Sequence, residues 1–368
     1  MNYYLLGRSG LRVSRLALGT MTFGSEWGWG AEKDGARQLF DAYRDAGGNF
    51  YDTADLYTNG TSEKWLGEFV RDTGSRDEAV VSTKFTFNGT QGNPNAGGNG
   101  RKNILRAVEG SLKRLQTDYI DLYFLHAWDG FTRAEEVART LDDLVSSGKV
   151  RYVGLSDVPA WYASRVQTLA EWRGYEPVTA LQLEYSLVER AIENEYVDIA
   201  RELGPGIMVW SPLAGGLLSG KYKPGKDGEV EGKGRLATVK GSDNAAFDKF
   251  NDRNFEIVAE LEKVAEELGQ PMASVATNWA ASQPGIGSVI IGATKLHQLE
   301  GNLKALDFEI PAELMARLDE ASATKPGFPY SFFQPGMQGM ITGGATVGDK
   351  PAGYAHPRLV DAEPAGSQ

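Results

Sequence analysis

Four side chains of the sequence have the types and spacing to transfer a proton. Asp52, Lys84 and His126 each lie at the end of a short apolar run, and Tyr57 follows Asp52 by a few residues. A tyrosine phenol titrates near about 10, and a neighbouring ammonium lowers that pKa. An aspartate keeps such an ammonium charged, and a histidine can hydrogen-bond a carbonyl oxygen. The set can therefore protonate an oxygen while another group delivers a hydride to carbon.

Each of these residue types also has an ordinary structural role. A tyrosine in a loop is commonly a surface aromatic, and a lysine at a strand end is commonly solvated. A histidine after an apolar strand is commonly held by structural hydrogen bonds. Four chemically compatible groups at three successive strand ends form a stronger signal than any one of them.

The chain alternates short apolar runs with amphipathic segments. The strand-like runs are 15–21, 49–54, 79–84, 120–126, 150–156, 178–185, 206–212 and 287–294. Helical patterns follow at 34–46, 62–71, 102–115, 134–147, 159–170, 193–203, 271–282 and 295–305, with an extra helix at about 248–268. This order predicts an α/β fold, a (β/α)8 TIM barrel, with a doubly wound sheet as the alternative. A parallel barrel would bring the four side chains to one mouth.

Other segments lie outside the alternation. The start of the chain alternates around a glycine turn and predicts a β-hairpin that closes the bottom of the barrel. Residues 88–100 and 215–247 are rich in glycine and polar residues and predict long loops at the C-terminal face. We assign residues 1–325 to the barrel. Residues 326–368 form a tail, which we expect to lie partly over the mouth and to be partly flexible.

Composition narrows the partners and the location. The formal net charge is −11 and no basic cluster occurs, which argues against nucleic acid and an anionic membrane as partners. The sequence has 0 cysteine residues, which excludes disulfides and thiolate metal sites. Its 3 histidines lack the spacing of metal ligands. The N-terminus shows neither a signal peptide nor a membrane span, so we expect a cytoplasmic protein. The sequence leaves the oligomeric state open.

One nucleotide motif is a false match. The segment GGLLSGK at 215–221 has the glycine and lysine spacing of a P-loop, but Tyr222 follows where a magnesium ligand requires serine or threonine. No G-x-G-x-x-G occurs, so a nicotinamide enzyme of this sequence would not use the dinucleotide-binding fold.

Seven segments carry a resemblance to a known family. They are YDTADLY, VVSTKF, SLKRLQTDYIDLYFLH, SSGKVRYVGLSD, LQLEYSL, VWSPLAGGLLSGKY and IIGATKLHQLEGNLKAL, in this order. With them, the chain from about residue 3 to 310 resembles the aldo-keto reductases of the bacterial and potassium-channel β-subunit-like branch. The resemblance implies a catalytic tetrad of Asp52, Tyr57, Lys84 and His126, with Tyr57 as the proton donor.

The resemblance also implies the cofactor NADPH or NADP+ and its contacts. Ser156 and Gln182 would hold the nicotinamide carboxamide, and Trp210 would stack on the ring. The remaining contacts would be Gly19, Thr20, Met21, Asp52, Asp157, Ser211, Pro212, Leu213, Gly215, Leu217, Lys221, Gly292, Thr294, Lys295, Gln298 and Asn302. Asp157 stands where the family often has Asn or Arg, and Gly301 where an acidic residue is common.

The resemblance implies NADPH-dependent reduction of an aldehyde or ketone. Two alternatives remain open: a nucleotide-binding regulatory subunit with little turnover, and an alcohol dehydrogenase that works in the oxidative direction. The substrate would be a small carbonyl compound or alcohol, which the sequence does not identify. Trp27, Trp29, Trp128 and Phe332 could line its pocket or could serve ordinary packing.

Overall fold

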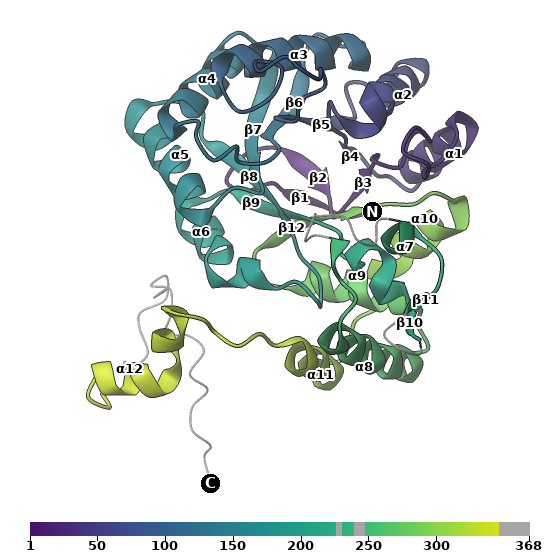
Figure 1. Ribbon diagram of the computed structural model, residues 1–368, viewed down its shortest axis with the longest axis vertical. Coiled ribbons are helices and arrows are strands. Elements are labelled where there is room, and N and C mark those ends of the chain that lie inside the picture. Colours follow the sequence, from purple (N-terminus) through teal and green to yellow (C-terminus); the bar gives the residue numbers. More distant parts are fainter. Residues whose placement is uncertain (226–229, 239–246, 346–368) are drawn as a thin grey trace. The chain divides into compact units, whose positions relative to one another are not determined.

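Eight parallel strands close into a barrel in the computed structural model, which describes residues 1–225, 230–238 and 247–345 (Figure 1). Around the barrel they are β3 (Leu16–Gly19), β4 (Phe50–Asp52), β5 (Val80–Phe85), β6 (Ile120–Leu125), β7 (Val150–Ser156), β8 (Val178–Glu184), β9 (Gly206–Trp210) and β12 (Ile286–Ile291), and β12 pairs with β3. The (β/α)8 TIM barrel predicted from the alternation is confirmed, and the doubly wound sheet is excluded.

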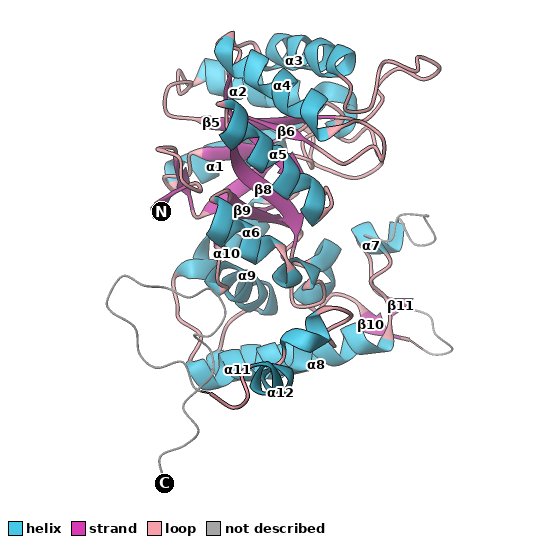
Figure 2. Cartoon of the chain, turned by 90° about the vertical axis from the view of Figure 1, so that its left-hand side faces the viewer, coloured by secondary structure: helices cyan, strands magenta, loops and turns pink. Residues whose placement is uncertain are grey.

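Helices surround the strands, as the side view shows (Figure 2). Those that follow barrel strands are α1 (Lys33–Asp45), α2 (Thr61–Asp72), α3 (Arg101–Leu115), α4 (Ala134–Ser146), α5 (Ala160–Arg173), α6 (Tyr196–Leu203), α9 (Met272–Ser282) and α10 (Leu296–Leu303). The apolar face of each helix packs on the outer side of the sheet, and this layer forms the larger hydrophobic core.

The extra helix α8 (Asp252–Leu268) begins later than the predicted residue 248, because the side chain of Asn251 caps it by accepting from the Asn254 N–H. Sequence patterns did not reveal α11 (Ala312–Ser322), whose Arg317 pairs with Glu260 of α8. They also did not reveal the short elements β10 (Lys223–Pro224), β11 (Val230–Glu231) and α7 (Arg235–Thr238) within the loop predicted at 215–247.

The predicted N-terminal hairpin is present as β1 (Tyr3–Leu5) paired with β2 (Arg12–Ser14), and it lies across the centre of the barrel in Figure 1. Leu6 and Val13 are fully buried with the inward-facing side chains of the strands. The Arg8 N–H donates to the Gly204 carbonyl, which precedes β9, at 3.0 Å. The hairpin therefore closes the barrel at the N-terminal ends of its strands, opposite the predicted mouth.

Strand β5 shows how the barrel sorts its side chains. Val80 belongs to the inner cluster, whereas Val81 and Phe85 belong to the layer between sheet and helices. The strand period of two therefore points Ser82 and Lys84 into the barrel with Val80. This alternation brings two polar side chains of one strand to the same interior site.

The chain divides into two compact units, Met1–Ser322 and Ala323–Gln368. Within the second, the described residues form a 3-10 helix, η7 (Tyr330–Phe333), and α12 (Pro335–Ile341), and the Phe332 ring meets the edge of Phe328. The position of the tail over the mouth and a substrate contact by Phe332 stay predictions, and residues 346–368 lie outside the described part. Among the described residues, no helix is long and apolar enough to cross a membrane.

The hairpin offers a matched test of how the barrel is closed. Leu6 is 0% exposed and its neighbour Leu5 is 58% exposed. We expect Leu6→Ala to lower the free energy of unfolding by about 2–5 kcal/mol, because it leaves a cavity beneath the barrel interior. Leu5→Ala should change it by less than about 0.5 kcal/mol. Urea unfolding of the two variants measures both values, and equal effects would contradict this role of the hairpin.

Candidate active site

The ends of three neighbouring strands bring the predicted catalytic side chains together. Asp52 is the last residue of β4, Lys84 lies near the end of β5, and His126 directly follows β6. The register places Asp52 opposite Ser82, and Lys84 opposite Phe124. Because parallel strands open at one mouth, all these side chains reach the same end of the barrel.

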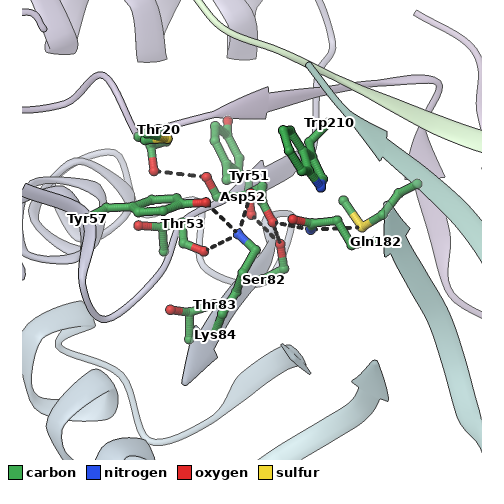
Figure 3. Close-up of polar contacts among 12 residues, drawn as sticks. Thr20, Tyr51, Asp52, Thr53, Tyr57, Ser82, Thr83, Lys84, Gln182 and Trp210 are labelled. Atoms are coloured by element: carbon green, nitrogen blue, oxygen red, sulfur yellow. Dashed lines mark hydrogen bonds and ion pairs between the residues drawn. The ribbon is translucent and has the colours of Figure 1, made fainter. Parts of the chain in front are cut away.

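The Lys84 ammonium is the centre of the site (Figure 3). Its Nζ donates to Asp52 Oδ2 at 2.6 Å, to the Thr53 carbonyl at 2.7 Å and to the Tyr57 hydroxyl at 3.3 Å. The side chains of Lys84 and Asp52 are 0% and 4% exposed. The three donor positions of the ammonium are therefore used, and one of them fixes the phenol.

Asp52 is held from its other oxygen by two side chains. Ser82 and Gln182 each donate to Asp52 Oδ1 at 2.8 Å. Ser82 did not feature in the sequence prediction, although it lies two residues before Lys84 in a strand and therefore shares its inward face. Gln182 was predicted to contact a cofactor, and here it also ties β8 to the charged pair.

Tyr57 lies on a tightly wound loop between β4 and α2. The Asp55 N–H donates to the Lys84 carbonyl, and the Thr58 hydroxyl donates to the Phe23 carbonyl. Thr58 and Asn59 have φ of 45° and 55°, a left-handed conformation that a β-branched residue such as threonine rarely adopts. Strain of this kind persists only when surrounding contacts fix the backbone, and here those contacts hold the Tyr57 hydroxyl beside Lys84.

Burial and charge act on the two coupled groups in opposite directions. Burial lowers the pKa of Lys84, but Asp52 and Tyr57 outweigh it, so the pKa of Lys84 is raised. Burial raises the pKa of Tyr57, and Lys84 lowers it by less, so the phenol remains the protonated form. The sequence correctly indicated that Lys84 lowers the pKa of Tyr57. It did not indicate that burial raises this pKa by more.

His126 faces the Tyr57 ring. The centroids of the His126 and Tyr57 rings are 5.7 Å apart. The centroid of the Phe87 ring is 4.8 Å from that of the imidazole. Burial and then the Lys84 charge hold the pKa of His126 well below its usual range, so the imidazole is neutral. Its Nδ1 is buried and has no hydrogen-bond partner in the described part of the chain. A neutral imidazole can donate a hydrogen bond without bringing a second cation to the site.

Aromatic side chains border the phenol. Trp27 lies 5.6 Å from Trp29 and 6.4 Å from Tyr57, measured between ring centroids. Two of the predicted pocket residues therefore reach the site, together with Phe87, which the sequence prediction missed. Trp128 packs against Trp161 at 5.5 Å, and the indole N–H of Trp128 is buried without a partner among the described residues.

A second group of side chains lies at the ends of β7, β8 and β9. Ser156 stands in register with Gln182, and Trp210 ends β9 with its indole N–H donating to Asp157 Oδ1 at 3.2 Å. The Ser156 hydroxyl is buried beside Asp157 and makes no hydrogen bond of normal geometry within the described residues. A buried hydroxyl and a partly exposed indole face, both at the mouth, fit the amide and ring of a nicotinamide.

Other predicted cofactor residues differ in their access to the mouth. Gly19 ends β3, while the Thr20 side chain is fully buried and donates to the Asp52 carbonyl. Leu217 is fully buried in the outer core. Thr20 and Leu217 therefore have structural roles, and a cofactor contact would involve their backbone. Ser211 Oγ accepts from the Gly215 N–H, and Pro212 and Leu213 lie between them.

Two cations lie close together on the segment after β9. Burial and then the charge of Arg235 lower the pKa of Lys221. The Arg235 guanidinium carbon is 5.0 Å from the Trp29 ring centroid, and its Nη2 contacts Met21 Sδ at 3.9 Å. Its Nε is buried without a partner, and neither cation forms an ion pair within the described residues. Two neighbouring cations that form no ion pair with the described residues suit an anion such as phosphate.

After β12, the space beside the Gly292 backbone is open, because an added Cβ would meet no atom within 4 Å. Gln298 Oε1 accepts from the backbone N–H groups of Thr294 and Lys295, at 3.0 and 3.2 Å. Asn302 donates to the Gly292 carbonyl at 3.2 Å. The first turn of α10 is therefore already capped by Gln298, and the Lys295 side chain is exposed beside it.

Comparisons with known proteins agree on one family. The model of the Aldo/keto reductase family matches residues 15–323. A probable voltage-gated potassium channel subunit beta of Oryza sativa subsp. japonica is 38% identical, over 89% of this chain and 98% of its own length. An aryl-alcohol dehydrogenase [NADP(+)] of Phanerodontia chrysosporium is 34% identical, over 89% and 87%. A norsolorinic acid reductase of Aspergillus flavus is 33% identical, over 89% and 82%.

Proposed function

Because the chain belongs to the aldo/keto reductase family, we propose that it reduces an aldehyde or ketone to an alcohol with NADPH, in a reversible reaction. The observation that carries the proposal is the buried Lys84 ammonium, which contacts both Asp52 and the Tyr57 hydroxyl at the mouth. NADPH, when bound, supplies a hydride to the carbonyl carbon. The side chains of the site supply the proton and orient the carbonyl oxygen.

Tyr57 donates the proton to the oxygen in this proposal. Its raised pKa keeps the phenol protonated near neutral pH, which is the form an acid catalyst requires. Lys84 stabilises the phenolate as the proton leaves, and Asp52 keeps Lys84 charged. The neutral His126 donates a hydrogen bond to the same oxygen and fixes the direction from which Tyr57 reaches it.

The same site holds the cofactor. Ser156 and Gln182 bind the carboxamide, and Trp210 packs on the nicotinamide ring. Lys221 and Arg235 neutralise the phosphates, which is supported by their closeness and by the lack of an ion pair to either cation within the described residues. Thr294, Lys295 and the exposed Lys233 contribute at the adenosine end.

The substrate is an aromatic carbonyl compound. This proposal is supported by the rings of Trp27, Trp29 and Phe87, which border Tyr57 and His126. Planar rings prefer offset or edge contacts with such a wall. One of the relatives is named as an aryl-alcohol dehydrogenase, and an aryl alcohol carries an aromatic ring. The same residues catalyse alcohol oxidation, so they leave the direction in the cell open.

A second candidate function is supported by the similarity to potassium-channel β subunits. The rice relative is 38% identical, and a related protein of Arabidopsis thaliana is 34% identical. A regulatory subunit would keep the nucleotide site and show little turnover. Oxidation of NADPH in the presence of a panel of aldehydes, ketones and quinones separates the two, because a regulatory subunit would bind NADPH without consuming it.

Tyr57→Phe tests the proton donor. We expect the turnover number to fall about 10²–10⁴-fold, because the ring and its packing remain while the proton is lost. The dissociation constant for NADPH should stay close to that of the wild type. Steady-state kinetics with an aromatic aldehyde and fluorescence titration with NADPH give both values. A variant that keeps more than about a tenth of the turnover would refute the role of Tyr57.

Lys84→Met tests how the phenol is tuned. Without the ammonium the pKa of Tyr57 should rise further, so the residual rate of reduction should persist to higher pH than in the wild type. The rate itself should fall strongly, and the loss of one partner of a buried ion pair should cost about 3–5 kcal/mol of stability. Circular dichroism confirms folding, and the pH profile of the residual rate is the measurement. An unchanged basic limb would show that another group sets this pKa.

The preference for NADPH over NADH tests the adenosine end. A charge-assisted contact to the 2′-phosphate is worth roughly 1.5–3 kcal/mol, or about tenfold to a hundredfold in affinity. We expect Thr294→Ala combined with Lys295→Ala to weaken NADPH by that factor and to leave NADH unchanged. Lys304→Ala, an exposed lysine at the other end of α10, is the matched control. Equal dissociation constants for NADH and NADPH in the wild type would count against this reading of the loop.

A further inference from the structure

The carboxylate of Asp157 lies at the mouth of the barrel, near the ends of β7, β8 and β9. Its Oδ1 accepts from the Trp210 indole N–H at 3.2 Å. Its backbone is fixed on both sides, because its N–H donates to the Gln182 carbonyl and its carbonyl accepts from the Trp128 N–H, each at 3.3 Å. The position of this carboxylate is therefore set by the barrel, and its only side-chain hydrogen bond of normal geometry among the described residues is to Trp210.

The fold does not require a charge at this position. A neutral asparagine could accept the same hydrogen bond from Trp210. Asparagine also tolerates the left-handed backbone of residue 157, which has φ of 45°. An acid in its place is also acted on by the carboxyl group of Glu184 at the end of β8, which pairs with Lys249 at 3.0 Å.

Burial and the carboxyl group of Glu184 work against the ionisation of Asp157. The pKa of Asp157 is raised to about 7, because burial and then Glu184 raise it by more than Trp210, Lys84 and Ser156 lower it. The residue is exposed to water at the open mouth, which moderates the effect of burial. A carboxylate that gains little from the protein around it points to a positively charged group of a ligand.

We propose that Asp157 is a positioning residue that makes the site bind the oxidised, positively charged nicotinamide more tightly than the neutral reduced ring. The inference rests on the proposed function, since Ser156, Gln182 and Trp210, which would surround the nicotinamide, also surround Asp157. Transfer of a hydride to the carbonyl carbon removes two electrons and one hydrogen nucleus from the reduced ring and leaves it with one positive charge. Tyr57 gives its proton to the carbonyl oxygen, so the alcohol is neutral.

A fixed negative charge beside this ring has two consequences. It stabilises the charge that develops during hydride donation, in the manner of a preorganised site. It also lowers the reduction potential of the bound nicotinamide, because the oxidised form gains affinity. A charge interaction over several ångströms at an effective dielectric constant of about 20 corresponds to a change in affinity on the order of tenfold. A tenfold change in the ratio of the two dissociation constants equals about 30 mV for this two-electron couple.

The experiment compares the affinities of NADP+ and NADPH in Asp157→Asn and in the wild type. Titration calorimetry of each protein gives both dissociation constants without turnover. We expect Asp157→Asn to weaken NADP+ about tenfold and to leave NADPH within about twofold. Asp77→Asn makes the same chemical change at an exposed turn before β5, at the opposite end of the barrel, and should change neither value.

The possible outcomes distinguish an effect of the Asp157 charge from an effect of its hydrogen bond to Trp210. An equal loss for both cofactors would mean that Asp157 acts only through Trp210, and an unchanged ratio would mean that its charge is without effect; either result overturns the proposal. A wild-type protein that binds neither cofactor would overturn the proposed function as well.

A measurement on the wild type alone gives a second test, which applies even if Asp157→Asn does not fold. The preference for NADP+ over NADPH should grow as the pH rises through about 7, because Asp157 becomes charged. Both cofactors carry the same 2′-phosphate, so its titration cancels in the ratio of their dissociation constants. A ratio that does not change with pH in this range would overturn the proposal.

Discussion

A charged lysine buried at the end of a barrel strand is the constraint on which the site depends. The Lys84 side chain is 0% exposed, and an unpaired ammonium in such a place would lose its proton. Asp52 prevents this at 2.6 Å, and Asp52 is in turn held by Ser82 and Gln182. The ion pair therefore fixes the relative positions of β4, β5 and β8. A change of register in any of these strands would leave a buried charge without a partner, at a cost of several kcal/mol.

The loop that carries Tyr57 is also fixed to the barrel and holds the phenol in place. Its backbone is tied to β5 through the Lys84 carbonyl and to the β3 loop through the Phe23 carbonyl. The left-handed residues Thr58 and Asn59 turn the chain toward α2 directly after Tyr57, whose hydroxyl accepts from the ammonium at 3.3 Å. A flexible loop would not keep two residues in this conformation, so the packing of the barrel supports the geometry of the site.

Topology explains why the sequence brought together the residues of the proposed catalytic group. Asp52, Lys84 and His126 end successive strands, and a parallel barrel opens all its strands at one mouth. The period of two could also have identified Ser82, which was missed. The left-handed turn at Thr58 was beyond prediction, because threonine is disfavoured there and only tertiary contacts impose it. Helix α11 was missed although Leu314, Met315 and Leu318, which pack in or against the core, have helical spacing.

The position of Arg235 shows where prediction from sequence ends. The sequence indicates that Arg235, in the long loop after β9, could fold with Lys233 over the 2′-phosphate of the cofactor, but it does not show which side chains the guanidinium contacts. Arg235 reaches the mouth because its neighbour Leu236 is fully buried and lies where a side chain at Gly215 would stand. Any larger residue at 215 would push Leu236, and with it the guanidinium, away from Met21 and Trp29. The charge distribution of the site therefore depends on the absence of a side chain at Gly215 as much as on the charged residues themselves.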